Sequence, residues 1–149
     1  MRDFARKTAA GLIFIKSRVR LLVAFIAVIV VLNACTIAPF SQQAYEQATS
    51  LKAEALILMD KATDSFSRHK SEVEAIKLDL DKAYEYARGR PQNEISTRQW
   101  EIIKDPGRGS LGGFLKRWED KEQLDQSFIN DAKGIVSDSF DIVRNMCII

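Results

Sequence analysis

The chain has 149 residues, of which 46% are apolar and 28% are charged, a composition that is ordinary for a globular domain and excludes a wholly disordered chain. Its net charge of +2 comes from the N-terminus, where six basic residues and one acidic residue precede Cys35; the remaining 16 basic and 19 acidic residues give the rest of the chain a charge of −3. Nucleic acid is therefore not an expected partner, because phosphate binding requires a concentrated basic face.

The first apolar segment spans residues 21–32 and reads LLVAFIAVIVVL. A bilayer core of about 30 Å requires roughly 20 apolar residues, and the basic residues Lys16, Arg18 and Arg20 prevent an upstream extension. An apolar run of this length behind a basic segment is typical of a secretory signal peptide. We therefore expect the chain after this run to be exported.

The residues that end this segment, Leu32-Asn33-Ala34-Cys35, resemble the lipobox of bacterial lipoproteins. In that family an aliphatic residue stands three positions before the cysteine and a small residue stands directly before it, as Leu32 and Ala34 do here; Asn33 is a less usual occupant of the tolerant position. The resemblance covers residues 1–35 only. It implies a signal peptide over residues 1–34, diacylglycerol on the Cys35 sulfur, cleavage before Cys35 and acylation of the new amino group. Two or three acyl chains anchor durably, because each buried CH₂ contributes about 0.8 kcal/mol.

The same resemblance implies a location and a tether. The protein would be lipid-anchored on the exported side of the cell membrane, and Thr36 favours the outer membrane in a Gram-negative host, because the family's inner-membrane retention signal often has aspartate there. Residues 35–40 would form the lipidated cysteine and a short tether, of which residues 36–40 reach about 17 Å when extended. The alternative is a chance cysteine beside an ordinary cleavable signal or a signal anchor.

Residues 41–149 are expected to form a helical-bundle domain. Between residues 41 and 88 there is no glycine or proline, and apolar or small residues recur at helical spacing. An extra step of four between Ala62 and Phe66 allows either one long helix or a helix pair. A capping box at residues 71–74 favours a restart near Ser71, but one long helix is slightly preferred.

Stop signals divide the rest of the chain into shorter helices. Residues 88–91, Arg-Gly-Arg-Pro, predict the end of the long helix with Gly89 as a left-handed cap. Ser96 opens a second capping box and a helix that stops at residues 105–107. Two more helices are expected from Ser110 and from near Asp125.

Because no strand alternation is visible, we predict an all-α fold, a small bundle in which the long N-terminal helix or helix pair packs antiparallel to the C-terminal helix. Trp100, Phe114 and Trp118 are expected to plug one end of this bundle.

Two segments have the form of a functional motif without its context. Gly107, Gly109 and Gly112 spell G-x-G-x-x-G, but the segment follows a predicted helix and not a strand, which favours an inter-helix loop over phosphate binding. His69 is the only histidine, so no His-His metal pair is possible. It lies between Arg68 and Lys70, and a solvated or break-facing histidine is favoured over a catalytic one. No metal, cofactor or enzymatic activity is expected.

The end of the predicted long helix is the candidate partner surface. Tyrosine and arginine are enriched at interface hot spots, and this segment gathers Tyr84, Tyr86, Arg88, Arg90 and Asn93. The alternative, which we weigh slightly higher, is a capped loop with ordinary exposed side chains.

The second cysteine, Cys147, has no partner if Cys35 is lipidated. Burial with Met146 against the bundle is favoured over a homodimer linked by a disulfide through Cys147.

The function expected from these features is that of a membrane-tethered helical lipoprotein of the bacterial cell envelope, which binds or scaffolds another envelope component. One alternative is an exclusion, immunity or inhibitor lipoprotein that blocks an incoming protein or enzyme. A third, disfavoured hypothesis is an enzyme that uses scattered carboxylates.

Overall fold

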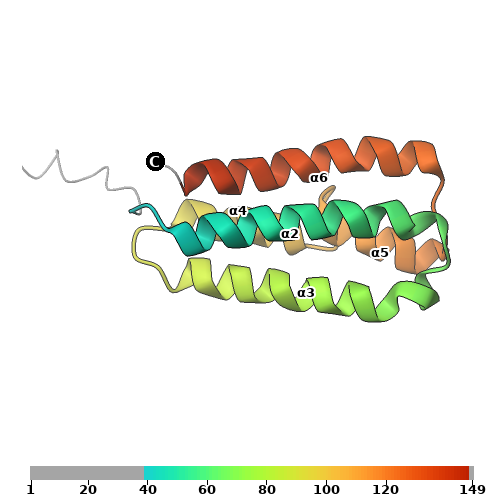
Figure 1. Cartoon of the computed structure of the whole chain (residues 1–149), viewed down its shortest axis with the longest axis horizontal. Coiled ribbons are helices and arrows are strands. Elements are labelled where there is room, and N and C mark those ends of the chain that lie inside the picture. Colours follow the sequence, from blue (N-terminus) through green and yellow to red (C-terminus); the bar gives the residue numbers. More distant parts are fainter. Residues whose placement is uncertain (1–38, 148–149) are drawn as a thin grey trace, which may run out of the picture. The chain divides into compact units, whose positions relative to one another are not determined.

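The structure is a computed structural model that describes residues 39–147. Within this range the chain forms five α-helices and a short 3₁₀-helix, and no strand. The elements are α2 (Gln42–Asp60), η1 (Lys61–Thr63), α3 (Phe66–Arg88), α4 (Glu94–Lys104), α5 (Leu111–Lys121) and α6 (Gln126–Met146). The predicted all-α bundle is confirmed (Figure 1).

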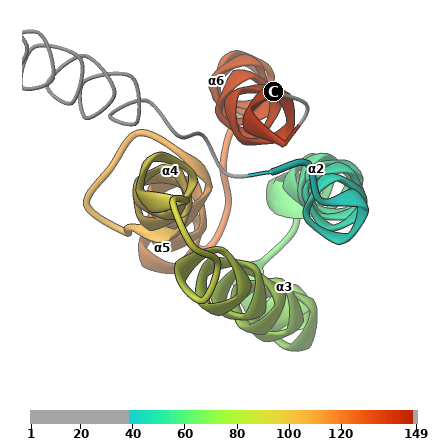
Figure 2. The same ribbon diagram turned by 90° about the vertical axis from the view of Figure 1, so that its left-hand side faces the viewer.

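The bundle has four legs. Three are the helices α2, α3 and α6, and the fourth consists of α4 followed by α5, which overlap when the molecule is viewed end-on (Figure 2). Helix α2 packs against both α3 and α6, and α4 packs against the same two helices. The chain directions of α2 and α6 are opposite, so the predicted antiparallel packing is also confirmed (Figure 1).

The first two legs are a helix pair, so the preferred single long helix is wrong. Helix α2 ends at Asp60, and α3 begins at Phe66, which places the break at the four-residue step; Ser71 lies inside α3. The break is held by tertiary contacts: the Phe66 amide donates to the Glu122 carbonyl oxygen at 2.8 Å, and the Leu124 amide donates to the Ala62 carbonyl oxygen at 2.8 Å. These bonds to the α5–α6 turn satisfy backbone groups that a continuous helix would have used.

The connection from α3 to α4 differs from the predicted glycine cap. Helix α3 ends at Arg88 as expected, but Gly89 has a φ of −75°, and the left-handed residue is Gln92 with a φ of 58°. Helix α4 begins at Glu94 and not at Ser96, because the buried Asn93 precedes it and donates its side-chain amide to the Ala87 carbonyl oxygen at 2.9 Å. This bond ties the start of α4 to the end of α3.

The starts of the last two helices are confirmed. The Phe114 amide donates to the Ser110 carbonyl oxygen at 2.9 Å, which makes Ser110 the residue before α5. Asp125 caps α6 with its carboxylate, which accepts a hydrogen bond from the Phe128 amide at 3.0 Å.

The expected aromatic plug is wrong, because its three members belong to separate parts of the core. Trp100 on α4 packs edge-on against Phe140, with ring centroids 5.8 Å apart. Trp118 on α5 packs edge-on against Phe66, and Phe114 stacks on Phe128. Helices α4 and α5 occupy opposite halves of their leg, so the two tryptophans fill different levels of the bundle (Figure 1).

Candidate functional site

The predicted anchor lies outside the described residues. Leu32, Asn33, Ala34 and Cys35 precede residue 39, as do the predicted signal peptide and most of the tether. Their roles therefore stay predictions. Within residues 39–147, none of the helices combines the length and the apolar character that a bilayer crossing requires.

The start of the described chain is fastened to the corner between α3 and α4, which comprises residues 84–93. The Tyr86 hydroxyl forms a 2.9 Å hydrogen bond with the Ser41 hydroxyl, and the Arg90 guanidinium donates to the Pro39 carbonyl oxygen. Ser41 also caps α2 by accepting from the Ala44 amide at 3.2 Å. The chain thus enters the bundle at this corner. Tyr86 and Arg90 are occupied by these contacts within the chain.

The other three residues of the candidate partner surface also have contacts within the chain. The Tyr84 hydroxyl donates to Glu101 on α4 at 3.2 Å. Arg88 forms an ion pair with Glu85 at 3.2 Å, and Asn93 is buried. Arg88, Arg90 and Asn93 line one surface hollow together, whereas Tyr84 and Tyr86 do not line it. The role of the five residues in partner binding stays a prediction.

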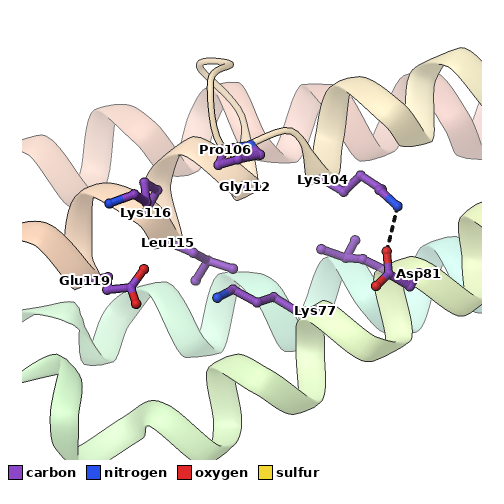
Figure 3. A pocket seen from close by; sticks show the side chains of 9 residues that line it. Lys77, Asp81, Lys104, Pro106, Gly112, Leu115, Lys116 and Glu119 are labelled. Carbon is purple, nitrogen blue, oxygen red and sulfur yellow. Dashed lines mark hydrogen bonds and ion pairs between the residues drawn. The ribbon is translucent and has the colours of Figure 1, made fainter.

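A cleft that the sequence did not indicate lies between α3 and the α4–α5 leg, with a volume of about 330 Å³ (Figure 3). The buried side chains of Leu80 and Leu115 form its apolar floor. Charged side chains surround this floor, three lysines and two carboxylates, which are Lys77, Asp81, Lys104, Lys116 and Glu119.

The cleft exists because the fourth leg of the bundle is interrupted between α4 and α5. Pro106 cannot continue α4, since it lacks a backbone N–H. Gly112, in the first turn of α5, lies so close to the end of α4 that a Cβ atom there would be 2.3 Å from the Lys104 carbonyl oxygen. Glycine thus permits α5 to start directly beside the end of α4, displaced sideways from the axis of α4. This displacement leaves the cleft open toward α3.

The lysines around the cleft are balanced by carboxylates. Lys104 donates to Asp81 across the cleft at 2.6 Å, and Lys77 pairs with Glu74 on its own helix at 3.1 Å. Lys116 donates a hydrogen bond to the Asp120 carboxylate, and this bond raises the pKa of Lys116. Surface pairs of this kind are weak and exchangeable. Every lysine of the cleft has a carboxylate partner, so the border carries no excess of positive charge. The cleft can therefore bind a polar segment around an apolar side chain, and its lining offers no Ser, Cys or His as a nucleophile or base.

Only the interruption of the helix next to this cleft could be predicted from the sequence. The Pro106-Gly107 stop was visible, but Lys77 and Asp81 come from a different helix than Lys104 and Lys116. Nothing in the spacing along the chain indicates that these residues face one another, because that depends on how α3 packs against the fourth leg.

His69 lies beside the α2–α3 break, and its surroundings differ from those expected from Arg68 and Lys70. Its ring nitrogens lie 3.0 Å from a Glu72 carboxylate oxygen and 3.3 Å from an Asp64 carboxylate oxygen. The side chain is only 15% exposed and its ring centroid is 5.7 Å from that of Trp118. The hydrogen bond from His69, followed by that from Lys61, lowers the pKa of Glu72. No cluster of His, Cys, Asp or Glu suited to hold a metal ion occurs in residues 39–147.

Cys147 is buried, as predicted. Its thiol lies 3.4 Å from the Val143 carbonyl oxygen, and burial raises the pKa of the Cys147 thiol. Met146 is half-buried, with its sulfur 3.8 Å from the Ser96 hydroxyl. A homodimer through Cys147 stays a prediction that the structure does not test.

Comparisons of the chain with protein-family models, curated proteins and solved structures find no match.

Proposed function

We propose that this protein is a membrane-tethered helical lipoprotein of the bacterial cell envelope that binds or scaffolds another envelope component. The proposal is supported by the lipobox-like residues 32–35 together with one structural observation. Two of the first three described residues, Pro39 and Ser41, are bonded to the α3–α4 corner through Arg90 and Tyr86.

This fastening has a consequence for orientation. Four residue steps separate Cys35 from Pro39, a reach of about 14 Å at full extension. Acyl chains on Cys35 would hold the α3–α4 corner close to the membrane surface. Because α2 and α3 meet at the opposite end of the bundle, that end is free to extend away from the bilayer (Figure 1).

The cleft of Figure 3 is the proposed partner-binding surface. It is favoured over the α3–α4 corner, because Tyr86 and Arg90 are occupied by the chain's own residues. Its apolar floor and mixed charged border fit a polar partner segment that carries an apolar side chain, because each lysine of the border can exchange its surface carboxylate partner for a group of the segment. No contact favours the exclusion, immunity or inhibitor role in particular, and it stays a prediction.

The anchor is tested by the intact mass of the protein extracted from the membranes of its native host, beside a Cys35→Ser variant. We expect a chain that starts at Cys35 and carries acyl mass, and we expect the variant to lose both the cleavage and the added mass. An uncleaved, unmodified wild-type chain would reject the lipoprotein assignment.

Partner binding is tested separately, with a photo-crosslinking amino acid at Glu119 in the cleft. The matched control position is Asp138, which is exposed on α6 and does not line the cleft. We expect a discrete adduct from position 119 that is lost when Lys77 and Lys104 are both replaced by glutamine. Equal adducts from both positions would reject the cleft as the binding surface and leave the anchor result unaffected.

A further inference from the structure

A second pocket lies between the loop of residues 106–110, the start of α5 and the side of α6, with a volume of about 380 Å³. Its walls are mainly apolar and include Phe114, Phe128, Ile135 and Val136. Ile135 is 56% exposed, so this wall of the pocket is accessible from solvent. In Figure 3 the chain between Pro106 and Gly112 projects away from the lysine-bordered cleft, so the second pocket is distinct from the proposed partner-binding surface.

A buried hydroxyl without a partner belongs to the lining of this pocket. Ser110 is 4% exposed, and its Oγ atom has no hydrogen-bond partner among the described residues. A serine before a helix usually accepts a hydrogen bond from an amide of the first turn, but Ser110 does not. Buried polar side-chain atoms are almost always paired in native proteins, so this hydroxyl has an unused capacity to bond with a group that enters the pocket.

The start of α5 provides donors at the same place. The Phe114 amide is the first in the helix to find a backbone acceptor, and the helix supplies none for the amides of Leu111, Gly112 and Gly113. A helix N-terminus favours a negative charge, because these N–H groups and the helix dipole carry partial positive charge. Gly113 lines the pocket, and a Cβ atom there would lie 1.8 Å from the Arg108 carbonyl oxygen. Glycine therefore keeps the loop close to these amides.

The charged residues of the pocket limit the ligand to one negative charge. Arg117 forms no ion pair within residues 39–147, and its guanidinium carbon lies 4.1 Å from the centroid of the Phe128 ring. Arg108 is already paired with Asp105 at 3.5 Å. Asp131 also lines the pocket without a cationic partner in the described chain, and it opposes a second negative charge.

We propose that this pocket binds a small amphipathic anion, namely a single carboxylate on a short apolar chain. The carboxylate is bound by the Ser110 hydroxyl, the start of α5 and Arg117, and the chain lies against Phe128, Ile135 and Val136. The pocket volume is within the range of about 300–1,000 Å³ that is common for small-molecule sites. The glycine-rich segment would thus serve anion binding at a helix N-terminus without the strand that a dinucleotide fold requires. This proposal does not depend on the lipid anchor or on the partner cleft.

The test is a titration of the full chain in nanodiscs with sodium hexanoate, followed by NMR of ¹³C-labelled isoleucine methyl groups. We expect the Ile135 resonance to shift and to saturate. Ile57 on α2 is also exposed but does not line the pocket, and its resonance should stay in place. Hexan-1-ol, which lacks the charge, and inorganic phosphate, which lacks the chain, should each bind at least 5-fold more weakly. An equal response to hexan-1-ol would overturn the proposal in favour of an apolar hollow only.

Variants separate binding from structure. Arg117→Gln should weaken hexanoate binding at least 3-fold, whereas Lys116→Gln, its neighbour on the other face of α5, should have no effect. Asp131→Asn should tighten binding 2- to 3-fold; a loss of affinity would mean that the ligand carries a positive charge and would overturn the assignment.

Ser110→Ala gives the sharpest result. It should weaken binding about 3-fold and leave the thermal midpoint unchanged or higher, because the hydroxyl has no partner within the protein. A lower midpoint with unchanged binding would show that the hydroxyl is structural and would reject its assigned role.

Discussion

Trp118 on α5 donates its indole N–H to the backbone carbonyl oxygen of Asp64 at 3.0 Å, and it thereby links the fourth leg of the bundle to the break between α2 and α3. Its side chain is completely buried and packs edge-on against Phe66, with ring centroids 5.6 Å apart. This end of the bundle is therefore fixed by a side chain that fills the core and satisfies a backbone group at the same time.

Replacing Trp118 by phenylalanine should lower the free energy of unfolding by about 2–3 kcal/mol, because it removes both the hydrogen bond to Asp64 and part of the buried ring. Urea denaturation followed by circular dichroism measures the loss. Trp100→Phe is the matched control, since Trp100 is also buried but its indole N–H makes no hydrogen bond within the described chain. The control should lose about 1 kcal/mol less; equal losses would contradict the role of the Asp64 bond.

Glycine at position 113 is required by the close approach of the α4–α5 loop. A Cβ atom there would lie 1.8 Å from the Arg108 carbonyl oxygen, whereas a Cβ at Gly134, exposed on α6, would meet nothing within 4 Å. We expect Gly113→Ala to destabilise the fold by more than about 2 kcal/mol and Gly134→Ala to stabilise it by about 0.5–1 kcal/mol. Thermal unfolding should give a lower midpoint for Gly113→Ala and a higher midpoint for Gly134→Ala. Midpoints that shift in the same direction would refute this prediction.

The ion pair between Lys52 on α2 and Asp141 on α6 predicts a pH dependence. The Lys52 ammonium donates to both Asp141 oxygens at 2.7 Å, and this hydrogen bond holds the pKa of Asp141 below its ordinary value, with Arg144 adding a smaller effect. Since the folded-state pKa is the lower one, the stabilisation is complete above the unfolded pKa of about 4 and is lost as the pH falls through the folded value.

Asp141→Asn should therefore lower the free energy of unfolding by about 0.5–1 kcal/mol at neutral pH, a modest amount because both side chains are partly exposed. The difference from wild type should shrink at pH 3. Urea denaturation at low ionic strength measures both values, and Asp138→Asn, at an exposed position on the same helix, provides the control. A difference of the same size at both pH values would argue against the ion pair as its source.

Cys147 should be protected from thiol reagents in the folded protein. Its side chain is 4% exposed, and burial raises the pKa of its thiol, so little thiolate is present at neutral pH. Labelling with iodoacetamide should be at least 10-fold slower in the folded chain than in urea. Rapid labelling of the folded chain, or a disulfide-linked dimer on a non-reducing gel that disappears with Cys147→Ser, would show that the thiol is accessible.

Several features of this fold were accessible from local sequence. Helical spacing between residues 41 and 88 identified the apolar faces of the first two legs, because residues three and four apart share one side of a helix. Pro91 and Pro106 follow the ends of α3 and α4, since proline cannot donate the next helical hydrogen bond. Apolar spacing predicts the start of α6 near Asp125, and the carboxylate of this residue caps the helix by binding an amide only three residues away.

The predicted helix starts are wrong where a contact with a distant residue overrides a local capping signal. The capping box at Ser71 did not start a helix, because the backbone at Ala62 and Phe66 bonds to the turn between α5 and α6. Likewise, Asn93 replaced Ser96 as the residue before α4, since its side chain reaches back to Ala87. Neither bond can be read from helical spacing.

The sequence by itself thus determined the helical class, most helix ends and the approximate bundle, because these depend on contacts within one or two turns. Only the tertiary structure decided which charged and unpaired groups meet. Lys104 faces Asp81, and Ser110 lies near Phe128, because the broken fourth leg packs between α3 and α6. Such juxtapositions arise from the packing of whole helices, and residue spacing along one chain does not encode them.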